Sequence, residues 1–452
     1  MRSTLPALTF LIIATWTLTN CNNIGDADPS MRETFIKFYE GSYSMSASSV
    51  EITQNGFVIL GNMLVKRLDT TFSQTIMIET DNNGNRIGEI HDFPGGTGKS
   101  FKALTDGAGV LTGYIVVGDS IYTNPQEPQA ANVIVSSMSI LIVDSEFENS
   151  RYLYITDRLP ISNGHPIKDD YYGGTINLTD NGVIILGTFK EGVPNQQAAP
   201  AQQLLFGLDS NLDSVWFMKY PLLGNTFSNS RSIHYKNGKI VWAASVQEIQ
   251  NNFISSYVTI PFVGEQSTYE NNSPIGQGEL KYYSANDIQP AYSPAFGYGI
   301  VGTYSEEIDG SNSNLFFAKV DHSGNIVNES DLYFDGIESF KGGFSPLTDK
   351  SLSSIVDGGE ALTSTQDGGF VLAGTFTTNP EKGNGARDLF LVKLNKSSQV
   401  VWMKTFGGSG DETPVAIRET SNGDLLVCGT NTLGDFASIF LMKMDKNGEL
   451  KN

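Results

Sequence analysis

The sequence predicts an all-β protein, a seven-bladed β-propeller built from four-stranded antiparallel blades. Two observations lead to this prediction: a short apolar pattern recurs along the chain, and no segment of useful length has a helical period. The pattern is a turn, four mostly apolar residues and a small closing residue, and its copies close 55 to 72 residues apart. The copies are GFVILG (56–61), GYIVVG (113–118), GVIILG (182–187), GKIVWA (238–243), GYGIVG (297–302), GFVLAG (369–374) and DLLVCG (424–429).

Each copy belongs to a longer unit, best preserved between Ala361 and Glu412. This unit reads as four strands: ALTST, then FVLAGTF after a tight turn at Asp367-Gly368, DLFLVKL, and VVWMKTF after a second turn at 396–398. Four antiparallel strands repeated seven times are typical of a β-propeller, whereas a β-helix would need much shorter coils. Eight blades, one of them irregular, are the alternative.

The two ends of the chain predict how the ring closes. The last unit ends with IFLMKMDKNGELKN, which lacks most of a fourth strand. Residues 34–41 (TFIKFYEG) match VWMKTFGG in their alternation, their lysine and their glycine exit. We therefore expect residues 34–41 to complete the blade formed by residues 438–449, which would remove an exposed sheet edge.

The first residues have the pattern of an export signal. Arg2 is followed by a 14-residue, mostly apolar run, Leu5 to Leu18, which is shorter than the ~20 residues that span a bilayer. The run leads into Leu-Thr-Asn-Cys, ending at Cys21, and this sequence resembles the lipobox of bacterial lipoproteins. We expect a signal peptide at 1–20, a lipidated tether at 21–33 and a propeller at 34–452. An ordinary secretory signal with an unrelated cysteine is the alternative.

The lipobox resemblance implies that Cys21 carries a thioether-linked diacylglycerol and, after cleavage, an acyl chain such as palmitate. Several chains on one residue give a stable anchor, since each buried CH₂ contributes ~0.8 kcal/mol. The expected location is the cell envelope of a bacterium, at the periplasmic or outer face of the outer membrane. A net charge of -20 argues against a nucleic-acid partner.

The repeat itself resembles those of bacterial β-propeller lipoproteins of unassigned activity. These repeats contain T-x-D-G-G-[FY]-h-h-h-G-T and W-x-K-T-F-G-G-x-G-x-D, which residues 365–375 and 402–411 match almost completely. The resemblance implies the fold and the envelope location, and it transfers no catalytic residue.

Two motifs that suggest ligands fit the repeat better. GGTGKS (95–100) is similar to a phosphate-binding loop, but Phe93 stands where that loop needs its first glycine. The segment aligns with the junction at 406–417, which predicts a following strand and matches Lys99 with Asp411. Residues 81–85 and 445–449 are similar to the start of a calcium loop, yet they lie where hairpin turns are expected.

The sequence predicts no catalytic, metal or cofactor-binding residue. The four histidines, His91, His165, His234 and His322, show no metal-ligand spacing, and no G-x-S-x-G elbow occurs. If Cys21 is acylated, Cys428 is the remaining thiol, and its apolar neighbours predict a buried core residue. Trp216 and Trp402 occupy the same place in the fourth strand, which predicts that both pack between blades.

Length variation is concentrated in the connectors of one face of the predicted disc, where binding usually evolves. These connectors are 62–74, 120–132, 190–202, 305–313, 335–356 and 377–387, while the long loop 264–279 lies on the other face. We expect a monomeric, non-enzymatic binding or scaffold module that contacts an unknown protein or glycan. A quinoprotein-like enzyme is the alternative, since D-x-x-G-x-x-x-W is similar to tryptophan-docking repeats.

Overall fold

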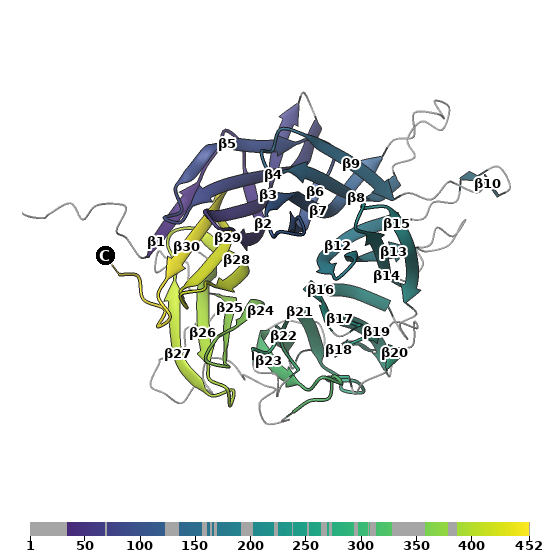
Figure 1. Ribbon diagram of the computed structural model, residues 1–452. Coiled ribbons are helices and arrows are strands. Elements are labelled where there is room, and N and C mark those ends of the chain that lie inside the picture. Colours follow the sequence, from purple (N-terminus) through teal and green to yellow (C-terminus); the bar gives the residue numbers. More distant parts are fainter. Residues whose placement is uncertain are drawn as a thin grey trace, which may run out of the picture.

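A computed structural model shows a ring of seven β-sheets around a central axis (Figure 1). It describes residues 34–451, apart from 68–69, 123–134, 156–160, 163–164, 167–169, 191–201, 221–224, 237, 251–252, 264–268, 271–273, 293–296, 306, 308–312, 328–357 and 378–386. Cys21, the signal segment 1–20 and the tether 21–33 lie outside the described residues.

Five blades are antiparallel sheets of four strands. The strands of each blade are named here in order from the central axis to the rim. Blade 1 consists of β2 (Met45–Ile52), β3 (Gly56–Arg67), β4 (Thr70–Asp81) and β5 (Arg86–Phe93); blade 2 of β6 (Thr97–Thr105), β7 (Leu111–Tyr122), β8 (Val135–Asp144) and β9 (Ser150–Ile155); blade 3 of β12 (Asp170–Thr179), β13 (Gly182–Lys190), β14 (Gln202–Asp209) and β15 (Ser214–Tyr220). Blade 6 consists of β24 (Gly358–Ser364), β25 (Phe370–Thr377), β26 (Arg387–Leu394) and β27 (Val400–Phe406), and blade 7 of β28 (Asp411–Glu419), β29 (Leu425–Leu433), β30 (Phe436–Met444) and β1 (Phe35–Tyr39).

Blades 4 and 5 depart from this plan in the described residues. Blade 4 contains β16 (Asn225–Lys236), β17 (Lys239–Gln250), β18 (Phe253–Thr259), β19 (Phe262–Val263) and β20 (Tyr269–Glu270), and both β18 and β19 pair with β17. Blade 5 contains β21 (Tyr282–Pro290), β22 (Tyr298–Ser305) and β23 (Asn314–Val320). The fourth strand that the repeat predicts for this blade would follow β23, where residues 328–357 lie outside the described part of the chain. A separate hairpin, β10 (Ile161–Ser162) and β11 (His165–Pro166), lies between blades 2 and 3 in the chain.

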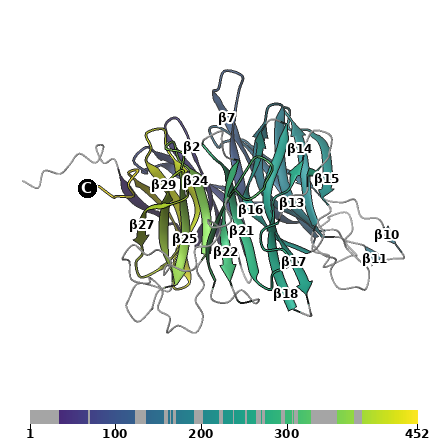
Figure 2. The ribbon, with the colours of Figure 1, turned by 90° about the horizontal axis from the view of Figure 1, so that it is seen from below.

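The ring is closed, and the number of blades is seven. The inner strands β2, β6, β12, β16, β21, β24 and β28 contact one another in this order, and β28 contacts β2. Figure 2 shows the same disc from the side, with the strands of each blade running between its two faces. The turns that join the first strand to the second and the third strand to the fourth, such as β2–β3 and β4–β5, lie on one face, which we call the turn face. The connections between the second and third strands, such as β3–β4, and the links between blades lie on the other, which we call the connector face.

The predicted closure by the N-terminal strand is confirmed. β1 pairs antiparallel with β30 from Phe35 opposite Lys443 to Tyr39 opposite Ile439. The Tyr39 hydroxyl donates to the Gly84 carbonyl of blade 1 at 2.8 Å, and Thr34 Oγ1 donates to the Lys451 carbonyl at 2.7 Å. β1 therefore forms the outer strand of blade 7 and connects this blade to blade 1.

The hydrophobic core is divided among the junctions between blades. Seven clusters of buried side chains are found in the described residues, one at each junction from 1/2 to 7/1. This follows from the two-residue period of a strand, since each apolar sheet presents alternate side chains to its two neighbours. Cys428 is fully buried in the 7/1 cluster, as predicted, and burial raises the pKa of its thiol to about 12.

The turns that suggested calcium loops are hairpin turns, as predicted. In the first, Asp81 Oδ1 accepts the backbone N–H groups of Asn83 and Asn85, both at 2.8 Å. Such Asx bonding and a left-handed residue three positions on make a tight turn. Gly84 takes that position in blade 1 and Gly448 in blade 7.

Three details of the predicted repeat are corrected by the strand pairing. The inner strand of blade 4 is irregular between Asn229 and Ile233, so the closing residue equivalent to Gly187 is Ala244 and not Ala243. In addition, residues 62–67 and 70–74 are not a loop, because they extend β3 and β4 into a long hairpin. The expected loop 264–279 likewise contains β20 and a bridge from Ile275 to Val258.

Candidate functional site

Each of the seven inner strands places one polar side chain at the same ladder position. In blade 3 this position is Asn177, which pairs with Ile184 and lies just beyond the β-bulge. These seven residues, called the axial ring, are Glu51, Lys102, Asn177, His234, Gln289, Thr363 and Arg418. Several of them bond to the next inner strand: Lys102 Nζ contacts Glu51 Oε1 at 2.6 Å, and Asn177 Nδ2 donates to the Ile233 carbonyl at 2.6 Å. The axial ring therefore ties neighbouring blades together.

Beside the axial ring, Asp287 is a buried carboxylate with several protein partners. Ser232 Oγ donates to its Oδ1 at 2.5 Å, and the Leu362 N–H of blade 6 donates to its Oδ2 at 3.1 Å. Burial raises the pKa of Asp287, and these bonds oppose that rise. Asp287 thus links the inner strands of blades 4, 5 and 6, which is a structural role.

The imidazole of His234 is also buried near the axis. Burial lowers its pKa to about 4, against the effect of a 2.7 Å contact between Nε2 and the Ile288 carbonyl, and the charges of Lys102 and Arg418 lower it further. Because those cations belong to blades 2 and 7, neither of which adjoins blade 4, the three side chains face a common axial space. The histidine is neutral at neutral pH and bonded to blade 5.

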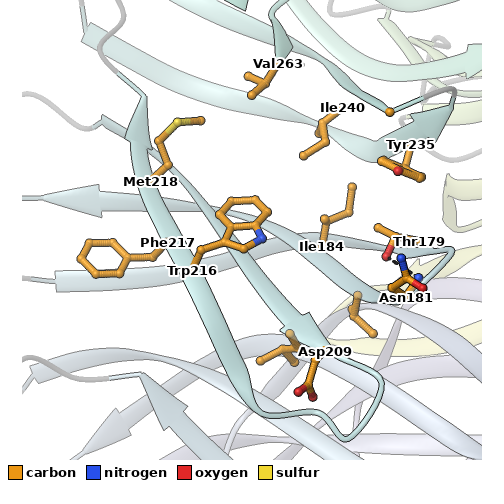
Figure 3. Close-up of a pocket in the computed structure, with 13 residues that line it drawn as sticks. Thr179, Asn181, Ile184, Asp209, Trp216, Phe217, Met218, Tyr235, Ile240 and Val263 are labelled. Carbon is orange, nitrogen blue, oxygen red and sulfur yellow. Dashed lines mark hydrogen bonds between the residues drawn. The ribbon is translucent and has the colours of Figure 1, made fainter. Parts of the chain in front are cut away.

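A pocket of about 540 Å³ opens between blades 3 and 4 on the turn-face side of the ring, and it is called the 3/4 pocket (Figure 3). The indole of Trp216, from the outer strand β15, lies in its wall, with Ile240 and Val263 of blade 4 on the other side. Its residues are Thr179, Asn181, Val183, Ile184, Leu208, Asp209, Trp216, Phe217, Met218, Tyr235, Gly238, Ile240 and Val263. The lining is mostly apolar, with a few polar groups from the turns.

The wall on blade 3 is open because a glycine lies under the indole. In the ladder, Ile184 faces Gly207 and Gly207 faces Trp216. A Cβ on Gly207 would lie 2.4 Å from the Trp216 ring, so only glycine permits this position of the ring. Blades 5, 6 and 7 place a lysine at the equivalent site: Lys319, Lys393 and Lys443.

The wall on blade 4 has an isoleucine, Ile240, at a ladder position where four other blades have an aromatic ring and where blades 3 and 7 have Val183 and Leu425. Blades 1, 2, 5 and 6 have an aromatic residue at this ladder position: Phe57, Tyr114, Tyr298 and Phe370. Phe370 shows what such a ring does, since it fills the space in front of Gly299 of the preceding blade, 2.6 Å from where a Cβ would stand. Ile240 carries no such ring, and it lines the 3/4 pocket together with Ile184, which stands where blade 5 has Gly299.

The two equivalent tryptophans have different surroundings. Trp402 packs against the cluster of the 6/7 junction and lies against Gly448 of blade 7, which confirms the predicted packing role. The same prediction is wrong for Trp216, whose side chain is 38% exposed and lines the 3/4 pocket, with Phe217 beside it 67% exposed. The sequence signal for this difference was a glycine at 207, where three other blades have a lysine.

A second pocket, of about 250 Å³, lies between blades 6 and 7 and is called the 6/7 groove. Ile36 and Phe38 of β1 form one wall, Leu389 and Phe406 of blade 6 form the other, and the glycine-rich link 407–410 crosses it. The groove lies toward the connector face, since that link joins β27 to β28.

A pair of carboxyl groups, Asp388 and Glu412, lies at the 6/7 groove. Burial raises the pKa of Asp388 to about 6 and that of Glu412 to about 7, and the charge of Asp411 raises both. The interaction between the two carboxyl groups lowers the pKa of Asp388 and raises that of Glu412, so Glu412 keeps its proton to the higher pH.

The phosphate-loop motif forms a junction between blades, as predicted. A strand, β6, follows the glycines, and Lys99 Nζ contacts Asp119 Oδ2 at 2.5 Å and donates to the Gly173 carbonyl at 2.9 Å. Lys99 is the bulged residue of β6, so its structural equivalent in blade 7 is Val415; the predicted match with Asp411 is wrong. The bulge inserts a residue that sequence alignment does not reveal.

The segments that suggested tryptophan-docking repeats form the turns before β15 and β27. Asp209 Oδ1 accepts the N–H groups of Asn211 and Asp213 at 2.8 and 3.0 Å, and Asn395 Oδ1 does the same in blade 6 for Ser397 and Gln399. The side-chain oxygens of Asp209 and Asn395 thus accept hydrogen bonds from the backbone of their own turns.

Much of the predicted connector face lies outside the described residues, including most of 120–132, 190–202, 305–313, 335–356 and 377–387. Within the described ranges, no three His, Cys, Asp or Glu side chains gather as a metal site would require. In the same part of the chain, no helix has the length and apolar character needed to cross a bilayer.

Comparison with known proteins supports the fold. No family model matches the chain, and no curated protein matches its sequence. Among solved structures, an ulvan lyase of polysaccharide lyase family PL25 aligns over 92% of this chain and 98% of its own, with 9% identity and a TM-score of 0.52. The sialidase of Trypanosoma rangeli aligns over 91% of this chain and 58% of its own, with 10% identity and a TM-score of 0.40. At these identities the likeness concerns the fold alone.

Proposed function

We propose that this protein is a lipid-anchored binding module of a bacterial envelope, without catalytic activity, and that the 3/4 pocket holds its ligand. The observation that carries this proposal is the unfilled, largely apolar pocket whose wall includes a partly exposed tryptophan. Ligand sites are typically concave and apolar with a few oriented polar groups. The connector face, as a surface for a larger protein partner, is the second contact area of the proposal.

The pocket chemistry favours a glycan over an apolar molecule. The indole of Trp216 offers a flat surface on which the C–H face of a sugar ring can stack. Thr179, Asn181 and Tyr235 lie at the other end, where they can bond to hydroxyl groups. A saccharide unit combines an apolar face with a hydroxyl edge, so its two sides match the two ends of the pocket.

Binding is tested with the domain starting at Arg32 on an array of bacterial envelope saccharides, followed by calorimetry with the saccharide that binds best. Trp216→Ala removes the stacking surface and should weaken that binding at least tenfold. Tyr292→Ala is the matched control, because Tyr292 is an exposed aromatic residue outside the pocket. Equal affinity of Trp216→Ala and the unchanged domain would contradict the assignment.

The lipid anchor is tested separately in cells. Cys21→Ala removes the proposed acylation site and should move the protein from the membrane fraction to the released fraction. Its propeller should melt at an unchanged temperature, because Cys21 precedes every described strand. Retention of the variant in the membrane fraction after a high-salt wash would refute the anchor.

The quinoprotein alternative is distinguished by absorbance. The purified domain is mixed with the quinone cofactor and calcium and then desalted. On our proposal the desalted protein shows no quinone absorbance, and a retained stoichiometric chromophore would favour the enzyme.

A further inference from the structure

We propose that the outer edge of blade 7 lies against the membrane surface. This inference rests on the proposed lipid anchor and adds the orientation of the disc. The edge is defined by four side chains, Ile36, Phe38, Leu433 and Phe436, which we call the membrane-facing edge.

The four side chains are large, apolar and exposed, with exposed fractions between 39% and 58%. Phe38 pairs with Phe440 and Leu433 pairs with Phe436 in the ladders of blade 7. Alternation along β30 places Phe436 and Phe440 on one side of the sheet, the side that faces blade 6. The four side chains therefore belong to one surface, continuous with the 6/7 groove, which Ile36, Phe38 and Leu433 line.

An exposed apolar cluster of this kind marks an interaction surface. The buried side of β1 is fully used by the protein: Phe35 contacts Phe57 with ring centroids 6.2 Å apart, and Tyr39 bonds to blade 1. On the other side, Ile36 and Phe38 stand where a solvated outer strand would carry polar residues. These two apolar side chains are explained if an apolar surface covers them.

The chain that precedes β1 identifies the covering surface. Phe35 follows Cys21 by fourteen residues, so the intervening tether extends at most about 50 Å. β1 is the outermost strand of its blade, at the rim of the disc (Figure 1). A lipid on Cys21 thus holds this rim close to the bilayer and raises the effective concentration of lipid at Ile36 and Phe38.

Apolar insertion suits the charge of the protein. The chain carries a net charge of -20, so general attraction to anionic headgroups cannot hold the disc to a membrane. Phenylalanine, leucine and isoleucine side chains instead enter the boundary between headgroups and acyl chains. We therefore expect the contact to persist at high salt.

This orientation places the 3/4 pocket away from the membrane. In a ring of seven, the junction between blades 3 and 4 is opposite blade 7, as Figure 1 shows for β15 and β1. A ligand would then approach from the side of the envelope space and not from the lipid.

The test anchors the mature chain chemically, so that its outcome does not depend on acylation in the cell. Cys428 is fully buried and Cys21 is the other cysteine, so a maleimide lipid in phosphatidylcholine vesicles attaches at Cys21. Phe38→Trp adds a fluorophore at the membrane-facing edge, and Phe217→Trp adds one at the opposite rim. With brominated lipid, the added emission at 38 should fall by at least half, and that at 217 should not change.

A second measurement uses the unsubstituted anchored protein, in case either variant folds poorly. Amide exchange of the peptide containing 433–436 should slow at least threefold on vesicles, while that of the peptide containing 210–217 should not change. Quenching or protection at 217 instead, or at neither position, would overturn the orientation. Failure of the anchor itself appears only in the Cys21→Ala fractionation, so the two proposals are tested independently.

Discussion

The 3/4 and 6/7 junctions start from the same sequence pattern and reach different structures. Both have a tryptophan at the same place in the outer strand of the preceding blade. In blade 6, Trp402 faces Lys393 across the ladder and packs toward blade 7. In blade 3, Trp216 faces Gly207, lies over it and leaves a pocket beside blade 4.

Lys393 explains the filled junction. It is 5% exposed, and its ammonium group donates to Asp367 Oδ1 at 2.7 Å and to Thr365 Oγ1. These are the threonine and aspartate of the T-x-D-G-G repeat motif, so the motif forms a polar cluster that satisfies a buried lysine. Although partial burial opposes it, the bonds from Lys393 and Thr365 lower the pKa of Asp367. The residue at this position of the third strand therefore contributes to the difference between the surroundings of Trp402 and Trp216.

The largest effect is expected when β1 is removed from the 6/7 junction. A chain starting at Ser42 lacks both the strand that pairs with β30 and one wall of the groove. It should melt at least 10 °C lower than a chain starting at Arg32, or aggregate, because a sheet edge and several apolar side chains are exposed. Thermal unfolding followed by circular dichroism compares the two chains. Equal melting temperatures would contradict the closure by β1.

The next effect concerns the buried lysine. Asp367→Ala leaves the ammonium group of Lys393 without its carboxylate and should cost about 2 kcal/mol of unfolding free energy, since the Asp367 side chain is itself 60% exposed and partly screened. Adding Lys393→Met to this variant should restore most of the loss. Urea unfolding of both variants measures the coupling. A double variant as unstable as the single one would mean that Lys393 is not the cause.

A smaller effect is expected at the equivalent position of the open junction. In Gly207→Ala the new methyl group would lie 2.4 Å from the Trp216 ring, so the ring must move. The unfolding free energy should change by about 1 kcal/mol or less, since the ring is partly exposed, while tryptophan emission shifts to longer wavelength and saccharide binding weakens. Gly107→Ala is the control, because a Cβ there meets no atom within 4 Å. Unchanged emission in Gly207→Ala would show that the indole does not rest on this glycine.

The smallest effect is a pH dependence at the 6/7 groove. The pKa of Glu412 is raised to about 7 in the folded protein, so folding retains a proton there that the unfolded chain releases between about pH 4.5 and 7. Stability from this group is therefore complete below pH 4.5 and is lost as the pH rises toward 7. Glu412→Gln removes this loss and should raise the melting temperature by a few degrees at pH 8, and by less at pH 5. Glu89→Gln, at an exposed glutamate of β5, should show no such difference; a gain for Glu412→Gln that was larger at pH 5 would contradict the assignment.

The fold was predictable because each blade has sequence signals within its own segment of the chain. Turn residues such as Asp367-Gly368 and the two-residue alternation after them need no distant partner, and they recur often enough to count the blades. Ring closure was predictable for the same reason, since residues 34–41 carry the pattern that the last unit lacks. The register of blade 4 was not, because the irregular stretch from Asn229 to Ile233 replaces a single bulged residue.

The candidate sites could not be predicted in the same way, because they depend on contacts between blades. Neither Gly207 nor Ile240 indicates a pocket by itself: Gly207 matters because the Trp216 ring lies over it, and Ile240 because it lines the pocket from the next blade. Asp388 and Glu412 belong to different sheets, so the mutual effect on their pKa values arises from the packing of blade 6 on blade 7. Aligning the blades column by column does reveal one sign, a glycine where three other blades have lysine.

The pairing of β1 with β30 also fixes the order of events in folding. It brings together residues at the two ends of the chain, such as Thr34 and Lys451, which are 417 positions apart. Contacts of such long range form slowly, and here they cannot form before the last strand has been synthesised. Until then, blade 1 and the edge of the incomplete ring lack their partners. Moving residues 34–41 to follow Lys451 would turn this final step into the formation of a local hairpin, and the permuted chain should close its ring faster while reaching the same blade.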